Sequence, residues 1–220
     1  MRYKNIIWDW NGTLFDDIDA CMASMDELLE RYGLAKIGSK ARYKSIFGFP
    51  VQQYYSKLGF DFSVTPFETL AHEYIALYEE NQKQSKLFSG ASGVLEEIKN
   101  SGIDQHIISA SKQQTLLHQM SRFGIIPYFT SINGLQDDFA VSKADIAKAL
   151  VLKIGRGTVF VGDTIHDWEV ADAAGCPCIL IANGHQDKQR LIGTSATVID
   201  NIDQLVEILD KHWKGDKHYE

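Results

Sequence analysis

The spacing of hydrophobic positions changes twice along the chain. Residues 3–8 form a short apolar run that ends in a turn, which is typical of a buried parallel strand. From about residue 16 to 85 the apolar residues recur at helical spacing, and no convincing strand interrupts them. The two clearest helical stripes are Met22, Met25, Leu28, Leu29 and Tyr32, followed by Gly33 as a stop, and Phe67, Leu70, Ala71, Tyr74, Leu77 and Tyr78. Thr65 is predicted to cap the second of these helices.

From about residue 86 onward, strands and helices alternate. The expected strands are "QHIIS", "YFTSI", "TVFVG", "CPCILIA" and "ATVID". This alternation predicts an α/β fold with a Rossmann-like, doubly wound parallel sheet. Because the first strand lies far upstream, the helical segment is predicted to be an insertion. We therefore expect a core of residues 1–15 and 86–212, a helical cap of residues 16–85, hinges near 14–18 and 84–90, and a polar tail of residues 213–220.

Composition narrows the class of partner. The net charge of −7, with no Lys/Arg run longer than two, argues against a nucleic-acid or anionic-membrane surface. No apolar run approaches the roughly 18 residues of a membrane span, and the apolar segment at the N-terminus is too short for a signal peptide. The three cysteines are expected to be free thiols, two of them in "CPC". These features predict a cytoplasmic protein.

Polar residues follow several predicted strands directly, where the ligands of open parallel sheets bind. Asp9 follows the first strand, Ser109 the second, and Asp163 the strand "TVFVG", with Asp167 one helical turn further on. Lys143 stands at the start of a predicted helix. Carboxylates gathered at one edge repel each other unless a cation compensates them, and hard oxygen ligands suit Mg²⁺. The cation would also neutralise a phosphate, so Asp9 is predicted to attack phosphorus as a nucleophile.

The stretches "DWNGTLFD", "IISASK", Lys143 and "VGDTIHDWEVADAAG" resemble the four motifs of the haloacid dehalogenase-like (HAD) phosphohydrolase superfamily. The most similar subgroup comprises the phosphoglycolate phosphatase and β-phosphoglucomutase-like enzymes, which carry a helical cap. The resemblance implies an aspartyl-phosphate on Asp9 and a small phosphorylated substrate. It also implies that Mg²⁺ is bound by Asp9, the backbone carbonyl of Asn11, Asp163 and Asp167. The phosphate would be contacted by Ser109, Lys143 and the amides near Gly12 and Ala110. The rest of the substrate would be contacted by Ser111 and Lys112.

Each of these residues also has a simpler interpretation. The stretch around Asn11 could be an Asx-type turn, and Asp163 could cap the helix that follows it. Lys112 or Lys148 could take the place of Lys143. Asp16 is expected to organise the loop that enters the cap, and His166 either faces the cleft or is solvated.

Asn11 departs from the pattern of the family. Most phosphatases of this superfamily have a second aspartate there, which protonates the leaving oxygen and later deprotonates the attacking water. An amide does neither at neutral pH, and such acid–base catalysis contributes roughly 10²–10⁴-fold. Turnover could survive with an acidic leaving group, with an acid from the cap, or as slow chemistry. The candidates for cap residues that close over the substrate are Arg42, Lys44, Phe47, Phe49, Tyr54 and Tyr55.

The sequence therefore predicts a Mg²⁺-dependent phosphatase and leaves two alternatives open. One is a catalytically impaired domain that binds a phosphorylated ligand or a partner. The other is a phosphonatase-like hydrolase, which would need a Schiff-base lysine such as Lys36, Lys40 or Lys44. Dehalogenases have a tyrosine at the Asn11 position and do not need a pair like Asp163 and Asp167, so dehalogenation is disfavoured.

Overall fold

A six-stranded parallel sheet forms the centre of the computed structural model, which describes residues 3–135 and 142–214. The strand order is β5-β4-β1-β6-β7-β8, and every neighbouring pair is parallel. The strands in chain order are β1 (Asn5–Trp8), β4 (Asp104–Lys112), β5 (Ser131–Leu135), β6 (Thr158–Gly162), β7 (Cys178–Ile181) and β8 (Thr197–Ile199). The order reverses direction around β1, and open parallel sheets bind their ligands at such a point, at the carboxyl ends of the strands, here β1, β4 and β6.

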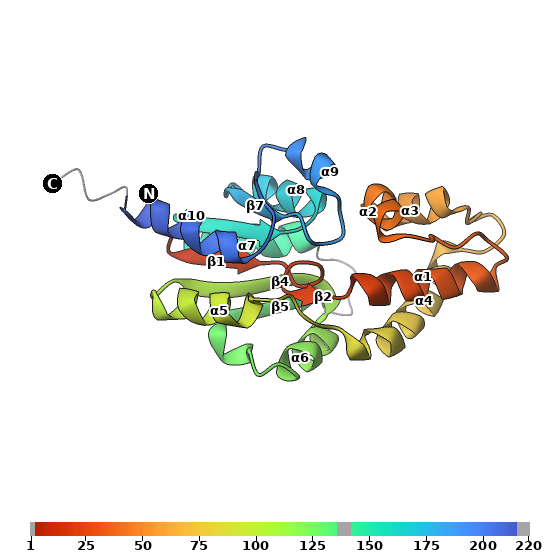
Figure 1. Ribbon diagram of the computed structural model, residues 1–220, viewed down its shortest axis with the longest axis horizontal. Coiled ribbons are helices and arrows are strands. Elements are labelled where there is room, and N and C mark those ends of the chain that lie inside the picture. The colour runs from red at the N-terminus through yellow and green to blue at the C-terminus, as the bar shows by residue number, and fades with distance from the viewer. Residues whose placement is uncertain (1–2, 136–141, 215–220) are drawn as a thin grey trace.

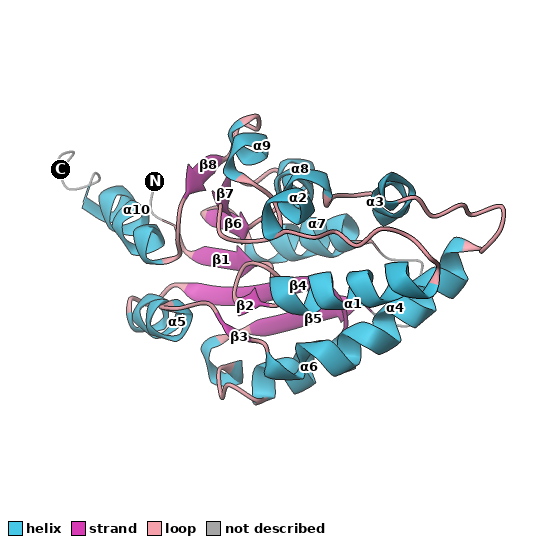
Figure 2. Ribbon diagram, turned by 45° about the vertical axis from the view of Figure 1, so that its right-hand side comes forward, coloured by secondary structure: helices cyan, strands magenta, loops and turns pink. Residues whose placement is uncertain are grey.

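Helices cover both faces of the sheet, as Figure 2 shows. Successive side chains of β1 point to opposite faces of the sheet, so Ile6 packs in one hydrophobic cluster and Ile7 in another. The helices that contribute to the Ile6 cluster are α5 (Ala91–Asn100), α6 (Gln113–Ser121) and α10 (Asp203–Lys214). The helices that contribute to the Ile7 cluster are α7 (Lys143–Ile154), α8 (Ile165–Ala174) and α9 (Lys188–Ile192). The predicted doubly wound α/β fold is confirmed.

Four helices between β1 and β4 pack around a third hydrophobic cluster, and we call them the helical cap. They are α1 (Ile18–Arg31), α2 (Lys40–Ile46), α3 (Val51–Leu58) and α4 (Phe67–Asn81). They lie at the opposite end of the molecule from α10 in Figure 1. The chain enters and leaves this region through a short antiparallel pair, β2 (Phe15–Asp16) and β3 (Lys86–Leu87), which the sequence did not predict. Short 3₁₀ turns span Gln82–Gln84 and Ile126–Tyr128.

Two local expectations differ from the structure. Thr65 does not cap α4: the residue before the helix is Pro66, and no side chain makes a capping hydrogen bond there. The predicted tail begins too early, because α10 continues to Lys214, while residues 215–220 lie outside the described residues. In contrast, α1 ends at Arg31, and Gly33 has a φ of 67°, as expected for a glycine that ends a helix.

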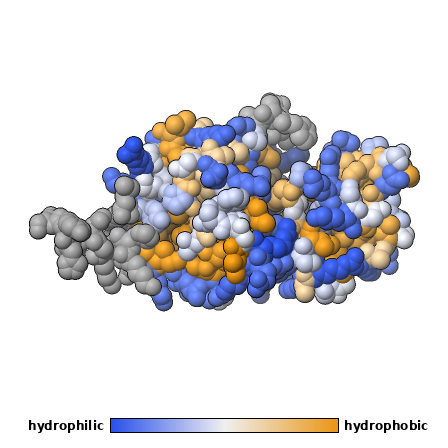
Figure 3. Space-filling model, turned by 90° about the horizontal axis from the view of Figure 1, so that it is seen from above, coloured by the Kyte–Doolittle hydropathy of each residue, from blue (hydrophilic) through white to orange (hydrophobic). Residues whose placement is uncertain are grey.

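The surface and the cysteines agree with the composition. Among the described residues, no helix is both long enough and apolar enough to cross a membrane. Figure 3 shows hydrophilic and hydrophobic side chains mixed over the visible face, including the end that the helical cap forms. All three cysteines are free thiols, as predicted.

Candidate active site

Three buried carboxylates meet at the carboxyl edge of the sheet. Asp9 follows β1 and Asp163 follows β6, and these strands are neighbours with Trp8 opposite Val161. Asp167 lies in the first turn of α8. One oxygen atom from each of the three carboxylates lies within 4.8 Å of the others. The parallel register therefore brings together the three aspartates that the sequence singled out.

Lys143 projects into this cluster from the first position of α7. The start of α7 is fixed by a capping box in which Ser142 and Asp145 bond reciprocally. The Lys143 ammonium makes an ion pair with Asp9 and donates to Asp167 Oδ1 at 2.6 Å. Of the two alternatives, Lys148 is exposed on the same helix, and Lys112 lines the cavity from the end of β4. Lys143 is thus the lysine that the fold places against the carboxylates.

Burial decides the electrostatics of the cluster. Burial raises the pKa of the Asp9 carboxyl to about 8, although Lys143 opposes the change, and burial raises the pKa of Asp163 to about 6. Asp167 is equally buried, but the ion pair with Lys143 and the hydrogen bonds from Thr164 outweigh burial and lower its pKa. One ammonium therefore does not compensate three carboxylates, and the cluster favours an additional positive charge.

The donor set of the cluster fits a small hard cation. The facing ligand atoms are carboxylate oxygens, and their separation allows one ion to touch all three. Oxygen ligands of this kind suit Mg²⁺, which prefers one or two carboxylates together with waters and phosphate oxygens. Asp9, Asp163 and Asp167 are therefore the residues that could hold a divalent metal ion.

The turn after β1 packs closely against the loops that follow β6 and β7. Gly12 has a φ of 74°, and a Cβ atom there would collide with the side chains of Asp163 and His185. Thr13 Oγ1 lies 3.1 Å from Asp163 Oδ1 and 3.3 Å from Asp9 Oδ2, so its hydroxyl can donate to either carboxylate. Glycine is thus required at this position for two reasons, its backbone conformation and the close approach.

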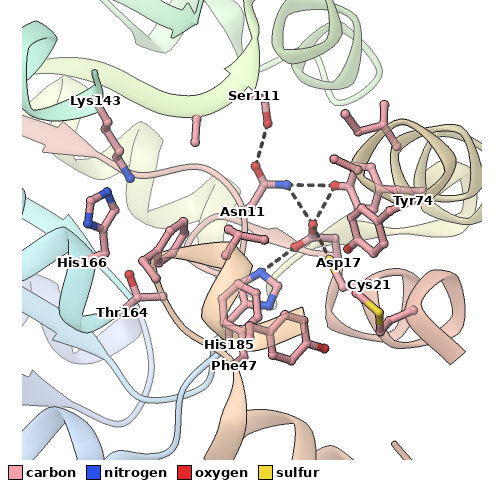
Figure 4. Close-up of a pocket in the computed structure, with 18 of the residues that line it drawn as sticks. Asn11, Asp17, Cys21, Phe47, Tyr74, Ser111, Lys143, Thr164, His166 and His185 are labelled. Atoms are coloured by element: carbon pink, nitrogen blue, oxygen red, sulfur yellow. Dashed lines mark hydrogen bonds and ion pairs between the residues drawn. The ribbon is translucent and has the colours of Figure 1, made fainter. Parts of the chain in front are cut away.

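The Asn11 side chain is held by partners on both sides. Its Nδ2 atom donates to Asp17 Oδ2 at 2.8 Å and to the Tyr78 hydroxyl at 2.9 Å. Its Oδ1 atom accepts from Ser111 Oγ at 2.9 Å, as Figure 4 shows, and more weakly from Ser109 Oγ at 3.5 Å. Both amide hydrogens are therefore engaged. The network links the sheet to the helical cap, because Tyr78 lies on α4.

Asp17 and His185 form a buried pair that sequence reasoning missed. His185 Nε2 lies 3.3 Å from Asp17 Oδ1, and His185 Nδ1 lies 2.9 Å from the Tyr43 hydroxyl. Burial alone would lower the pKa of His185, but Asp17 outweighs it and raises the pKa to about 9. Likewise, burial would raise the pKa of Asp17, but His185 and the hydrogen bonds from Tyr78 and Asn11 lower it.

A signal for His185 was present in the sequence. It follows the strand "CPCILIA" within a few residues, at the same edge of the sheet as Asp9 and Asp163. Its backbone N–H donates to Asp163 Oδ2 at 2.6 Å. The role of organising the turn belongs to Asp17 and not to Asp16, since Asp17 accepts from Asn11 and from the Gly12 N–H at 3.2 Å.

A cavity of about 410 Å³ lies between the carboxylates and the helical cap. Of the residues predicted for the site, it is lined by Asp9, Asn11, Ala110, Ser111, Lys112, Lys143, Asp163 and Asp167. Ser109 is buried beneath them, with its hydroxyl directed at Asn11 and at the Ser111 N–H. His166 also lines the cavity and stacks on Phe49, with ring centroids 4.5 Å apart.

The candidates in the helical cap divide into two groups. The aromatic ones, Phe47, Phe49, Tyr54 and Tyr55, line the cavity. The basic ones do not: Arg42 donates to the carbonyls of Lys36 and Ile37, and Lys44 donates to the carbonyl of Asn183 at 2.9 Å. The expectation that Arg42 or Lys44 faces the substrate is therefore wrong for this structure. Their partners are backbone carbonyls elsewhere, which pattern analysis does not reveal.

Fold and site together define a Rossmann-like α/β enzyme with a carboxylate cluster under a helical cap. The chain belongs to the haloacid dehalogenase-like hydrolase family, whose model matches residues 6–181. It is 26% identical over 216 residues to the tyrosine-protein kinase PtkA of Mycobacterium tuberculosis, covering 93% of this chain and 72% of that protein. It is 24% identical to the phosphoglycolate phosphatase of Pseudomonas fluorescens, covering 91% of this chain and 78% of that protein.

A solved structure agrees with the fold. A haloacid dehalogenase-like family hydrolase from Streptococcus pneumoniae superposes with a TM-score of 0.79 at 18% identity, covering 94% of this chain and 98% of that chain. The predicted membership of the superfamily is confirmed, and with it the assignment of the protein as a hydrolase.

Proposed function

We propose that the protein is a Mg²⁺-dependent phosphatase that transfers a phosphoryl group from a small phosphorylated metabolite to Asp9. One observation carries the proposal: Asp9, Asp163, Asp167 and Lys143 converge at the end of a cavity large enough for a metabolite. The family match and the phosphoglycolate phosphatase among its relatives support the same chemistry. The aspartyl-phosphate intermediate and the requirement for Mg²⁺ are themselves proposed.

In the proposed first step, a carboxylate oxygen of Asp9 attacks phosphorus. The new bond joins that oxygen to phosphorus, and the bond from phosphorus to the leaving oxygen breaks with both electrons on the leaving oxygen. Lys143 neutralises the charge of Asp9 and would contact the phosphoryl oxygens, as would the Ala110 and Ser111 region. A bound Mg²⁺, held by Asp9, Asp163, Asp167 and the backbone carbonyl of Asn11, would screen the dianionic phosphate from the carboxylates.

In the proposed second step, water attacks the phosphorus of the acyl phosphate on Asp9. The bond between phosphorus and the Asp9 oxygen breaks, the carboxylate of Asp9 is restored, and both protons of the water leave with the phosphate as dihydrogen phosphate. No residue is required to gain a net proton. A base at the Asn11 position would speed this step, so we expect hydrolysis of the acyl phosphate to limit turnover.

The proposal is tested by phosphate release with and without Mg²⁺ on a panel of acyl, aryl and sugar phosphates. A complex of the protein with BeF₃⁻ and Mg²⁺ would reveal whether Asp9 carries the phosphoryl mimic. We expect release that requires Mg²⁺ and disappears in Asp9→Asn. No release by the wild type, with release restored by Asn11→Asp, would instead favour the alternative that the domain binds a phosphorylated ligand or a partner without turnover. Asn11 is the observation that favours this alternative.

A phosphonatase-like reaction receives no support from the helical cap. Lys36 pairs with Glu30, Lys40 pairs with Asp19 and Lys44 bonds to a backbone carbonyl, and none of the three lines the cavity. A Schiff-base lysine would need to reach the substrate. A cytoplasmic location and the absence of nucleic-acid or membrane partners stay predictions from the sequence.

A further inference from the structure

The end of the cavity that faces the helical cap is lined by apolar and aromatic side chains. They come from α3, α4 and the loop before α3, and include Phe47, Phe49, Tyr54, Phe67, Tyr74 and Ile75. Their rings already pack edge to face, with centroids 5.3 Å apart for Phe47 and Tyr54. Tyr74 and Phe47 flank the Asn11 network on the side away from Lys143 in Figure 4. Such walls match the flat face of another aromatic ring.

Two apolar side chains at this end are exposed to solvent. Phe49 is 40% exposed and Ile75 is 43% exposed, and both line the cavity. They belong to the few large hydrophobic residues that are exposed among the described residues. An apolar occupant of the cavity would remove part of this surface from water, which is favourable in proportion to the area covered.

This end offers little to an anionic leaving group. Among the described residues that line the cavity, the basic side chains are Lys112, Lys143, His166 and His185, and all four come from the elements of the sheet domain. The helical cap contributes the acidic Glu79, while Arg42 and Lys44 are directed elsewhere. The helical cap therefore supplies no basic partner for a desolvated carboxylate or second phosphate on the leaving group. The basic rings in contact with these walls are His166, against Phe49, and His185, which is already paired with Asp17.

The hydrogen bonds of Asn11 restrict which leaving groups can depart, and this restriction is independent of the apolar lining. Both amide hydrogens of Asn11 are engaged by Asp17 and Tyr78, and an amide supplies no acidic proton. Both ring nitrogens of His185 have partners as well, Asp17 and Tyr43. Neither Asn11 nor His185 is therefore placed to protonate the leaving oxygen, which favours a leaving group that departs as a stable anion. A phenol ionises near pH 10, whereas water, as a guide to simple alcohols, has a pKa of about 15.7, so a phenolate is by far the better leaving group.

We propose, on the basis of the phosphatase function proposed above, that the substrate is the phosphate monoester of a phenol. The ring binds among Phe47, Phe49, Phe67 and Tyr74, and the phosphate lies at Asp9 and Lys143. When the Asp9 oxygen attacks, the bond between phosphorus and the aryl oxygen breaks, the phenolate keeps the electron pair, and it takes its proton from water after release. The apolar walls and the engaged amide of Asn11 thus select the same class of substrate.

The test compares kcat/KM for four phosphates that separate the ring from the leaving group. Phenyl phosphate has both features, benzyl phosphate has a ring but leaves as an alcohol, acetyl phosphate leaves easily but has no ring, and phosphoglycolate has neither. We expect phenyl phosphate to exceed benzyl phosphate and phosphoglycolate at least ten-fold, and to have a lower KM than acetyl phosphate.

Two variants and a matched control locate the ring. Ala71 lines the cavity from α4, so Ala71→Phe fills the space and should lower kcat/KM for phenyl phosphate at least ten-fold more than for acetyl phosphate. Ala76→Phe makes the same change at an exposed position of α4 outside the lining and should leave both substrates within two-fold of wild type. Ile75→Lys, at a partly exposed position, should shift preference from phenyl phosphate towards phosphoglycolate.

The outcomes distinguish this inference from the proposed function. If acetyl phosphate is hydrolysed but phenyl phosphate is no better than phosphoglycolate, the substrate class is wrong and the phosphatase proposal stands. If Ala71→Phe lowers both activities equally while Ala76→Phe does not, the ring does not bind where we place it. If none of the four phosphates releases phosphate with Mg²⁺, the proposed function is wrong, and this inference is wrong with it.

Discussion

The cavity ends in three carboxylates and an ammonium at the sheet, and in aromatic rings at the helical cap. Each side chain of the polar end is positioned by a strand end or by a capped helix start, and Asp167 alone accepts four hydrogen bonds from neighbouring groups. The aromatic end is built from side chains that contact each other edge to face. On the proposed function, this separation assigns the reaction chemistry to the sheet domain and the choice of substrate to the helical cap, so that a substitution at one end should leave the other end intact.

The largest effect is expected from removing the nucleophile at the polar end. Asp9→Asn keeps the size of the side chain but supplies no carboxylate to attack phosphorus. We expect kcat to fall by at least about 10⁴-fold, as for loss of other covalent nucleophiles. Phosphate release under saturating Mg²⁺ measures this fall in kcat. The control is thermal unfolding, because loss of activity through misfolding would lower the midpoint as well. Residual activity above about 1% of wild type would contradict the assignment of Asp9.

Removing the Lys143 ammonium should lower activity less than removing the Asp9 nucleophile. Lys143→Met preserves much of the length and apolar volume of the side chain but leaves Asp9 and Asp167 without their cation. We expect a fall of about 10²–10³-fold in kcat/KM, similar to loss of one preorganised electrostatic contact. The exposed Lys148 on the same helix provides the matched control, since Lys148→Met should have almost no effect. Equal losses in the two variants would mean that Lys143 does not act at the site.

The Asp17–His185 pair predicts how stability depends on pH in metal-free protein. Because the pKa of His185 is raised from 6.5 to about 9, its contribution is fully present below pH 6.5 and is lost as pH rises through about 9. The contribution is at most ~3 kcal/mol, since one pKa unit corresponds to about 1.4 kcal/mol. The pKa of Asp17 is lowered, so its own contribution is lost only in acid, outside this window.

Urea unfolding between pH 6 and 9.5 measures this loss, with Asp17→Asn as the reference. The raised pKa of Asp9 also changes stability in this range, but it does so in both proteins and cancels in the difference. We expect the stability advantage of wild type over the variant to shrink as pH rises. A constant difference would mean that His185 is not charged at neutral pH.

The smallest effect is expected from adding an acid at the polar end. Asn11→Asp introduces this acid without changing the aromatic end. We expect about ten-fold higher kcat/KM for benzyl phosphate and much less gain in kcat/KM for phenyl phosphate, whose leaving group needs no proton. The new carboxylate would face Asp17, so we also expect lower stability. Equal gains in kcat/KM for both substrates would mean that the new carboxylate does not act as an acid towards the leaving group.

The parts of the site that could be predicted are those that depend on the strand order alone. Asp9, Asp163 and Asp167 follow apolar runs, and in a parallel sheet the carboxyl ends of neighbouring strands necessarily share an edge. The position of Lys143 depends on one further feature, because this residue begins a helix and does not follow a strand. Its position follows from the capping box of Ser142 and Asp145, which fixes where α7 begins.

The parts that could not be predicted depend on how the helical cap packs onto the sheet domain. Asp17 and His185 lie 3.3 Å apart across 168 positions of sequence, and Tyr78 reaches Asn11 from α4. The helical spacing of the stripe from Phe67 to Tyr78 by itself predicts a face that packs in the core of the cap. In the structure, some of its residues pack in the cap core while Phe67, Tyr74 and Tyr78 also line the cavity. Helical spacing identifies such a face but does not specify what it packs against.

Apolar periodicity and strand order are local and topological properties, and they were enough to predict the fold class, the sheet edge that holds the candidate site, and the identity of the carboxylates. The directions of Arg42 and Lys44 away from the cavity, the aromatic rings that face it, and the engagement of both hydrogens of the Asn11 amide became visible with the folded chain. These outcomes depend on long-range packing, in which each side chain takes the partner that the folded chain brings within reach.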